Sequence, residues 1–315
     1  MSEQVEQAAR LLRRGEVVGI PTETVYGLAG NGFDLQAVSR IFAIKNRPRF
    51  DPLILHTDSL EKIESWVGTL PDTARRLADA FWPGPLTLVV PTSARIPDLV
   101  TSGLPAVAFR IPAHPLTQKL LQQLDFPLAA PSANPFGYIS PTSAQHVRDQ
   151  LGNKVSLVLD GGTCTVGVES TIVATRDSEE RRVLRLGGLS LEKLEAVVGK
   201  LEVQTHSSSN PAAPGMLKSH YAPRKKLILG DPVDLLREYE PQRTGVLLFQ
   251  NTELPCSPAV LRILSPQGDT EEAARHLFAY LRELDAAAID RILAEPLPET
   301  GLGRAINDRL RRASV

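Results

Sequence analysis

Sulfur chemistry is nearly absent from this chain. Its 315 residues include only two cysteines, Cys164 and Cys256, which lie far apart in unlike surroundings. They form neither a zinc motif nor a disulfide framework, a pattern typical of proteins from the reducing cytosol. The sequence therefore predicts a cytoplasmic protein without a cysteine-based metal site.

Long hydrophobic runs and an excess of charge are also missing. No apolar stretch approaches the roughly 20 residues of a membrane helix, and the first 16 residues show helical periodicity instead of a signal peptide's apolar core. Lys and Arg total 35 against 36 Asp and Glu, a formal net charge of −1. General nucleic-acid binders usually carry a clear basic excess, so this balance weighs against that class, although a local basic patch stays open.

The short motifs of several enzyme classes do not occur. The chain has no P-loop, no Gly-x-Gly-x-x-Gly after a strand, no His-Glu-x-x-His, no Cys-x-x-Cys and no Gly-x-Ser-x-Gly. "GGTCTVGVES" is glycine-rich but lacks the P-loop lysine. Zinc enzymes and serine hydrolases therefore have no support.

What is present is a regular alternation of strand and helix patterns. Hydrophobic residues at 42% and charged residues at 23% are ordinary for a globular protein, and the length suggests about two domains. Strands are predicted at 17–21, 52–56, 86–90, 106–111, 126–130, 156–160, 169–174 and 183–187. Helices are predicted near 35–45, 59–67, 72–81, 114–124, 142–150 and 190–198. This pattern predicts an α/β domain around a twisted open mixed sheet.

A break in composition divides the chain. "VQTHSSSNPAAPGMLKSHYAPRKK" is rich in Ser, Pro and Gly and predicts a linker. We predict a first domain at 1–202, a linker at 203–225 and a smaller Rossmann-like α/β domain at 226–315. Its predicted strands are 226–230, 245–249, 260–264 and 286–290, and its helices lie near 232–239, 270–284 and 303–313. On the linker's composition alone, its aromatic rings would simply dock on a domain surface.

Polar side chains cluster where apolar strands end. The stretch "GIPTETVYGLAG" places hydroxyls and a carboxylate at what we predict to be a strand-to-helix corner, and "PSANPFGYISPT" and "GVESTIV" repeat that arrangement. Arg110 and Arg185 end two further strands, and His56 ends another. Loops at strand ends are where open α/β sheets hold ligands, so these residues predict one shared cleft.

The cations in this set permit two interpretations. Lys45 and Arg47 follow a predicted helix, where they either cap the helix in solvent, which is favoured from the residues alone, or bind a polyanion from a surface loop. Arg110 lies in an apolar strand, where it reaches solvent or meets a buried anion with equal weight. His56 alone is typical of a structural residue.

Taken together, the motifs resemble one family. "PTETVYGL", "KNRP" before "PLILH", "AFRIP", "PSAN", "SPT", "GVESTIV" and "RLGG" stand in the order of the YrdC-like threonylcarbamoyl-AMP synthases. "PGMLKSHYAP" and the second domain resemble the long form. The resemblance implies a sheet with a large concave cavity, and an enzyme that joins L-threonine, bicarbonate and ATP into threonylcarbamoyl-AMP with release of pyrophosphate. A separate transferase complex would pass the product to tRNA.

The resemblance also implies roles for individual residues. Lys45 and Arg47 would be catalytic, with Mg²⁺ held by the ATP phosphates. L-Threonine would be bound by Thr22, Thr24, Tyr26, His56, Arg110, Ser132, Ser170 and Thr171. ATP would be bound by Lys45, Arg47, Asp51, Asn134, Ser140, Thr142, Arg185, His220 and Tyr221. The last two residues would fold back from the linker and close the cavity against water.

The sequence differs from the family motifs at two places, and two other functions are alternatives. Asp51 stands where the family usually has asparagine, and a carboxylate near a triphosphate is unfavourable unless a cation meets it. Phe136-Gly137 replaces the usual Ser-Gly, so that loop can differ. An RNA-binding module using the concave surface, with weak tRNA contact, is the main alternative. A carbamoyl-adenylate domain of hydrogenase maturation ranks lower because its accessory modules are missing.

Overall fold

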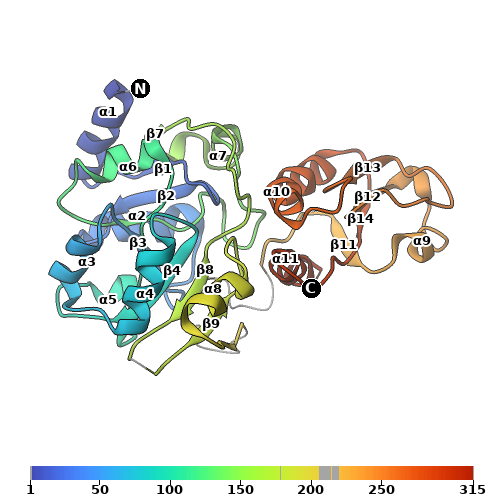
Figure 1. Ribbon diagram of the computed structural model, residues 1–315. Helices are drawn as coiled ribbons and strands as arrows, with labels where there is room; N and C mark the ends of the chain where they lie inside the picture. The colour runs from blue at the N-terminus through green and yellow to red at the C-terminus, as the bar shows by residue number, and fades with distance from the viewer. Residues whose placement is uncertain (1, 178, 206–213, 215–219, 315) are drawn as a thin grey trace.

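Two sheets of different character make up the molecule (Figure 1). The computed structural model describes residues 2–177, 179–205, 214 and 220–314. Ten strands form the first sheet, in the order β10-β9-β8-β4-β5-β3-β6-β2-β1-β7, and four form the second, in the order β11-β14-β12-β13. Pairs in the first sheet are both parallel and antiparallel, whereas every pair in the second is parallel. The predicted fold class is confirmed.

The strands have the following bounds: β1 Val18–Ile20, β2 Gly27–Asn31, β3 Ile54–His56, β4 Leu86–Pro91, β5 Ala106–Arg110, β6 Leu128–Ala129, β7 Leu157–Val158, β8 Thr171–Ala174, β9 Arg182–Arg185, β10 Glu202–Val203, β11 Lys226–Leu229, β12 Thr244–Leu248, β13 Val260–Ile263 and β14 Arg291–Ala294. The α-helices are α1 Ser2–Arg13, α2 Leu35–Lys45, α3 Leu60–Val67, α4 Asp72–Phe81, α5 Asp98–Thr101, α6 Pro115–Leu121, α7 Ala144–Leu151, α8 Leu191–Val198, α9 Pro232–Leu235, α10 Thr270–Ala286 and α11 Gly303–Ala313. Two short 3₁₀ turns, η1 Gly152–Lys154 and η2 Pro241–Arg243, complete the described elements.

Local chemistry explains where the helices begin and end. Asp34 caps α2 by accepting the backbone N–H of Gln36, and Asn46 ends that helix in the left-handed conformation at φ 52°. Ser59, Ser143 and Ser190 cap α3, α7 and α8 in the same way as Asp34. The predicted helices at these places therefore form within a few residues of their expected bounds.

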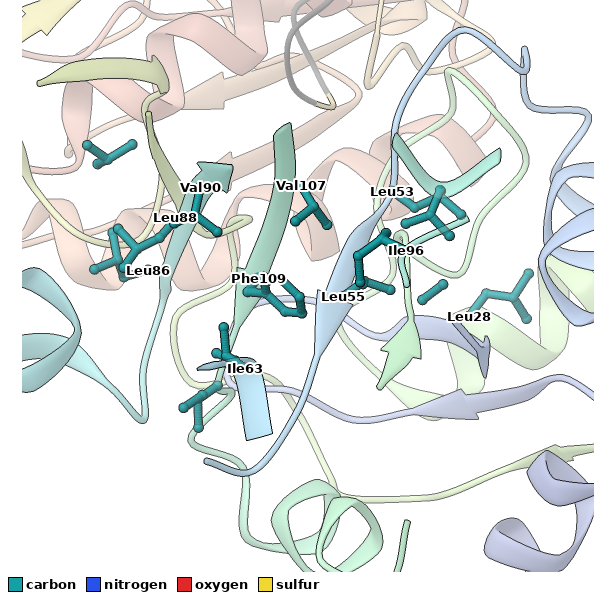
Figure 2. Close-up of a cluster of buried hydrophobic side chains, with 14 of the residues drawn as sticks. Leu28, Leu53, Leu55, Ile63, Leu86, Leu88, Val90, Ile96, Val107 and Phe109 are labelled. Carbon is teal, nitrogen blue, oxygen red and sulfur yellow. The ribbon is translucent and has the colours of Figure 1, made fainter. Parts of the chain in front are cut away.

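The main core lies against one face of the first sheet. Leu86, Leu88 and Val90 of β4 and Val107 and Phe109 of β5 point the same way, as alternate residues of a strand do (Figure 2). A second cluster, which includes Val5, Leu12 and Ile20, packs α1 and α6 on the other side. None of the helices in the described residues has the length and apolar character that crossing a membrane requires.

Two local predictions are wrong. Residues 27–31 form strand β2 between β1 and β6, although a corner leading directly into a helix was expected. Their two glycines give little strand propensity, so pairing on both sides decides the conformation. The strand expected at 286–290 lies instead at Arg291–Ala294, because the alanine-rich segment before it continues α10 to Ala286.

The predicted domain boundaries fall beside the last and first strands of the two sheets. Strand β10, at Glu202–Val203, belongs to the first sheet and β11 begins the second at Lys226. Of the predicted linker at 203–225, residues 206–213 and 215–219 lie outside the described residues. The three boundaries stay a prediction.

Helices α10 and α11 lie on the side of the second sheet that faces the first domain (Figure 1). Arg282 of α10 donates from Nε to the carbonyl of Ser140 at 3.2 Å and from Nη2 to the carbonyl of Ile139. Tyr138 donates its hydroxyl proton to Asp285 at 2.6 Å. The apolar core of the second domain also takes in Val25, Ile139 and Val168 of the first. The two domains thus share a packed boundary that lies beside the predicted cleft.

Candidate functional site

The loop after β1 forms a chain of hydrogen bonds that ends on Arg110. The hydroxyls of Thr22 and Thr24 are 2.8 Å apart, and Thr22 donates to the carbonyl of Val25 at 2.7 Å. Arg110 donates from Nη1 to Thr24 Oγ1 at 2.8 Å, so the hydroxyl protons run from Thr24 through Thr22 to the backbone. Both threonines are buried. This arrangement leaves the hydroxyls in one fixed orientation.

Glu23, to which the sequence assigned no role, is the anion that Arg110 meets. Its Oε1 accepts a hydrogen bond from Nη2 of Arg110 at 2.6 Å, and its Oε2 accepts one from the backbone N–H of Ala113 at 3.0 Å. Arg110 is 4% exposed. Of the two interpretations left open by the sequence, the buried anion is the one observed.

Three candidate side chains end strands that run in the same direction. β3 and β5 are parallel, and His56 stands in register with Arg110. Strand β4 is antiparallel to β5, and β8 is parallel to β4, so β8 runs opposite to β5. Because β9 is antiparallel to β8, it runs in the same direction as β5. Arg185 at the end of β9 thus lies at the same edge of the sheet as His56 and Arg110. This topology explains why residues so far apart in sequence share one site.

His56 is a neutral group in this site. It is 4% exposed, and its Nδ1 lies 3.3 Å from the carbonyl of Ile54. Burial, and then the nearby Arg110, lower the pKa of His56 to about 3. A neutral imidazole at the cavity wall can bind polar groups without adding charge.

Lys45 and Arg47 are buried, which overturns the expectation of an exposed surface loop. Lys45 donates from Nζ to the carbonyls of Ser132 and Asn134, the latter at 2.6 Å. Arg47 is ion-paired with Asp51 at 2.9 Å and donates to the carbonyls of Asp51 and Pro52. Burial, followed by the charge of Arg47, holds the pKa of Lys45 well below its usual range. The two cations are structural anchors of this loop as well as candidate ligands.

Asp51, the residue where the family usually has asparagine, thus meets a cation. Its side chain is fully buried, and burial raises the pKa of its carboxyl group, while Arg47 and then Lys45 act against that rise. A carboxylate at this position was expected to be tolerated only beside a cation, and Arg47 is that cation.

Arg185 differs from the other two arginines of the cavity. It donates from Nε to the carbonyl of Ser170 at 3.0 Å, from Nη2 to Ser170 Oγ at 3.0 Å and from Nη1 to the carbonyl of Pro214 at 3.3 Å. Within the described residues no carboxylate lies at ion-pairing distance from it, whereas Arg47 and Arg110 each have one. Burial lowers the pKa of Arg185 from its ordinary value. A buried guanidinium without a carboxylate partner is suited to an anionic ligand.

These side chains surround a cavity of about 50 Å³. Ten predicted site residues line it: Thr22, Thr24, Arg47, His56, Arg110, Ser132, Ser170, Arg185, His220 and Tyr221. Seven others do not line it: Tyr26, Lys45, Asp51, Asn134, Ser140, Thr142 and Thr171. The binding roles of both groups stay a prediction.

Several of the seven hold the loops around the cavity. Tyr26 donates its hydroxyl proton to the carbonyl of Gly162 at 2.7 Å, and Thr171 donates to the carbonyl of Leu189 at 2.6 Å. Asn134 donates to the carbonyls of Pro135 and Tyr138, and Thr142 Oγ1 lies 3.4 Å from Nδ1 of His146. Ser140 donates to Glu169 Oε1 at 2.5 Å. As the structure stands, these contacts fix the backbone of the site.

The linker reaches the cavity through His220, Tyr221 and Pro214. Tyr221 has a positive φ of 64°, is 1% exposed and stacks on Phe278 of α10 with ring centroids 5.7 Å apart. His220 packs edge-on against Tyr221 and Phe136, and its Nδ1 has no hydrogen-bond partner in the described part of the chain. Burial, then the charges of Arg47 and Lys45, keep the pKa of His220 well below its usual range. The linker end thus forms one wall of the cavity.

The sequence placed Glu23 and Glu169 among the polar residues of the predicted cleft without assigning either a role, and it gave no indication of Arg309. Glu23 pairs with Arg110, and Glu169 lines the cavity. A carboxylate inside a hydroxyl-rich strand end, beside buried arginines, is the signal that would have indicated both. Arg309 of α11 pairs with Glu169 at 3.0 Å from the other domain, and nothing in its helical context points to that contact.

Comparisons with known proteins agree over the whole chain. Residues 10–187 match the family described as "Telomere recombination", and residues 189–315 match "Threonylcarbamoyl-AMP synthase, C-terminal domain". The chain is 41% identical to the threonylcarbamoyl-AMP synthase of Pyrococcus abyssi, over 99% of this chain and 94% of that protein. It is 39% identical to the Bacillus subtilis protein of the same name, over 99% and 93%. The chain belongs to the threonylcarbamoyl-AMP synthase family.

A solved structure of this family has the same architecture. The P. abyssi protein Sua5, crystallised in complex with L-threonine, superimposes with a TM-score of 0.93 at 40% identity. The match covers 100% of this chain and 95% of that one. The matches over both domains therefore confirm the resemblance that the sequence motifs indicated, including the two-domain form.

Proposed function

We propose that this chain catalyses the formation of L-threonylcarbamoyl-AMP from L-threonine, bicarbonate and ATP, with release of pyrophosphate. The observation that carries the proposal is the cavity itself: three buried arginines, one of them without a carboxylate partner, beside an ordered pair of threonine hydroxyls. Two substrates of this reaction are anions and the third carries a carboxylate. The synthases to which this chain is similar are named for the same product.

The residues divide into two groups around the reacting atoms. Thr24, His56 and Arg110 would hold L-threonine, the ligand bound in the structure of the P. abyssi relative. Arg47 and Arg185 would face the ATP phosphates, where guanidinium groups donate paired hydrogen bonds. Ser132 and Ser170 also line the cavity and would supply further hydroxyls for threonine.

The chemistry needs positioning more than a nucleophile from the protein. The amino group of threonine adds to the carbon of CO₂, which bicarbonate releases with loss of hydroxide, and the amine gives up a proton. An oxygen of the resulting carbamate attacks the α-phosphorus of ATP, and the bond to the β,γ-pyrophosphate breaks. Fixed arginines stabilise the charge that develops on the phosphates. This is why a site without a catalytic serine, cysteine or charged histidine suffices.

Magnesium belongs to the proposal as a companion of ATP. In the described residues no three His, Cys, Asp or Glu side chains come together as a metal site, and Asp51 is already paired with Arg47. The ion would therefore be held by the phosphate oxygens, where it neutralises charge on the leaving group.

The wall formed by the linker has to shift when ATP enters. A volume of about 50 Å³ is far below that of a pocket for a nucleotide, which ranges over roughly 300–1,000 Å³. Pro214, His220 and Tyr221 are the lining residues that come from the predicted linker. Their return after binding would keep water from the labile carbamate, as lids do in other enzymes.

The product would act outside this chain. We propose that it works in the cytoplasm, where ATP and tRNA occur together, and that a separate transferase complex passes the threonylcarbamoyl group to tRNA. Contact between this chain and tRNA would then be weak and transient.

Pyrophosphate release by the purified protein tests the proposal. We expect release that requires L-threonine, bicarbonate and ATP together, with threonylcarbamoyl-AMP detected by mass spectrometry. Reactions that lack one substrate, and a reaction with L-valine, which replaces the substrate hydroxyl by a methyl group, serve as controls. Release that continues without threonine or bicarbonate would contradict the proposal.

A further inference from the structure

Glu169 is a carboxylate of the cavity that is held from the other domain. Its Oε1 accepts the hydroxyl proton of Ser140 at 2.5 Å, and its Oε2 accepts Nε of Arg309 at 3.0 Å. Arg309 belongs to α11, and its side chain is fully buried. The charge of a residue in the active-site cavity is therefore balanced by a residue 140 positions later in the chain.

Arg309 also contacts two other parts of the cavity's surroundings. Its Nη1 donates to the carbonyl of Leu186 at 2.7 Å, just before the glycine pair that follows β9. Its guanidinium carbon lies 5.0 Å from the centre of the Tyr221 ring in the linker. One side chain thus touches the Glu169 loop, the end of the Arg185 strand and the linker wall.

Electrostatics gives this contact a consequence for substrate binding. The cavity has to admit phosphates and a carboxylate, yet Glu169 places a negative charge on its wall. Of the cavity's own arginines, Arg47 and Arg110 are paired with Asp51 and Glu23. An uncompensated buried carboxylate would repel anionic ligands at a distance of a few ångströms. Arg309 is also paired with Asp308 at 3.0 Å, and Asp308 has Arg312 as a second cationic partner, so the four charges balance. Arg309 thus removes the repulsion from Glu169 without occupying the cavity, which it does not line.

We propose that Arg309 is a positioning residue of the synthase reaction, through which the C-terminal domain neutralises and orients Glu169 so that the cavity accepts anionic substrates. This inference rests on the proposed function. It gives the second domain a direct part in the chemistry of the first, in addition to packing against it. Glu169, held in this way, in turn fixes the hydroxyl of Ser140.

A second arginine of the same helix provides the matched control. Arg304 also bridges the domains, from α11 to Glu192 of α8, but its side chain is 29% exposed and that of Glu192 is 51% exposed. Neither residue lines the cavity. If α11 serves only to dock the domains, neither arginine should affect KM for ATP, although removal of the buried Arg309 would cost more stability.

The experiment measures KM for ATP and kcat from pyrophosphate release, together with the melting temperature. The variants are Arg309→Met, Arg309→Lys, Arg304→Met and the double variant Arg309→Met with Glu169→Gln. We expect Arg309→Met to raise KM for ATP on the order of tenfold or more, because the carboxylate is left unpaired. Arg309→Lys keeps the charge and should recover most of that loss. The double variant removes both charges and should bring KM for ATP within roughly threefold of the unaltered chain.

Three results would overturn the inference. One is a KM for ATP that Arg309→Met changes no more than Arg304→Met does. Another is a loss in Arg309→Met confined to melting temperature and active fraction. The third is a double variant whose KM for ATP is no lower than that of Arg309→Met. If Arg309→Met does not fold, the double variant is compared with the unaltered chain, and a KM for ATP raised tenfold or more would overturn the inference. An unaltered chain without threonine-dependent pyrophosphate release would instead refute the proposed function.

Discussion

The two domains bury charge in different places. In the first, buried charged residues gather around the cavity, where Arg47, Arg110, Arg185 and Glu169 line its wall. In the second, the buried charged residues Asp285, Asp308, Arg309 and Arg312 all lie on α10 and α11, the helices that face the first domain. The four-stranded sheet itself packs apolar side chains on both faces.

This difference shows what each domain is built to do. Burying a charge is costly, so it persists where a ligand or a partner surface needs it. The first domain bears that cost at a binding site, and the second bears it at its contact with that site. Substitutions at the cavity should therefore lower activity, whereas substitutions at the domain boundary should lower stability.

The largest effect is expected from the apolar side of the boundary. Phe278 of α10 is fully buried and stacks on Tyr221. Phe278→Ala removes that ring from the core and should lower the free energy of unfolding by about 3–5 kcal/mol, as measured by urea denaturation. Leu261→Ala, at a residue 38% exposed in the same domain, should change it by less than about 0.5 kcal/mol. Equal effects would mean that the boundary is loosely packed.

The cavity should respond in activity more than in stability. Arg185→Met removes the guanidinium that lacks a carboxylate partner, and we expect kcat to fall on the order of 100-fold in the pyrophosphate assay. Arg182→Met, on the same strand with a side chain 34% exposed, should retain activity. An active Arg185→Met variant would show that the anionic ligands depend on Arg47 and Arg110 instead.

Acid should weaken the first domain through its buried histidines. Folded His56 stays neutral down to about pH 3, whereas the unfolded side chain binds a proton below about pH 6.5. Unfolding therefore takes up a proton in this window, and stability is lost as the pH falls, by up to about 1.4 kcal/mol per pH unit for one histidine. Half-buried His146, and His220 at the end of the linker, act in the same direction. Urea denaturation between pH 7.5 and 4.5 gives the free energy of unfolding at each pH. Its decrease with falling pH should be less steep in His56→Gln than in the unaltered chain, and an equal decrease would contradict this assignment.

The smallest effect is expected from exposed pairs between the domains. Lys193 and Glu271 lie 3.1 Å apart with side chains 60% and 62% exposed. Lys193→Ala should lower the free energy of unfolding by less than about 1 kcal/mol, because water screens such pairs. A larger loss would mean that the domains are held together by surface charge and not by the buried contacts of α10 and α11.

The sequence by itself determined the fold class and most element positions. Local patterns sufficed for these, because strand alternation, serine caps and apolar helix faces depend on neighbours in the chain. The ten predicted residues that line the cavity were indicated by the family motifs and not by local patterns. It did not predict strand β2, whose glycines form a strand only between two paired neighbours. Nor did it predict that Lys45 and Arg47 would be buried.

Only the tertiary structure decided which charges meet. Glu23 with Arg110 and Glu169 with Arg309 are pairs whose members are 87 and 140 positions apart. Periodicity and motif carry no information on such distances, since a buried ion pair depends on two surfaces brought together by packing. The family motifs therefore indicated residues that line the cavity, whereas packing within the first domain and against α11 settled which charged side chains pair with one another.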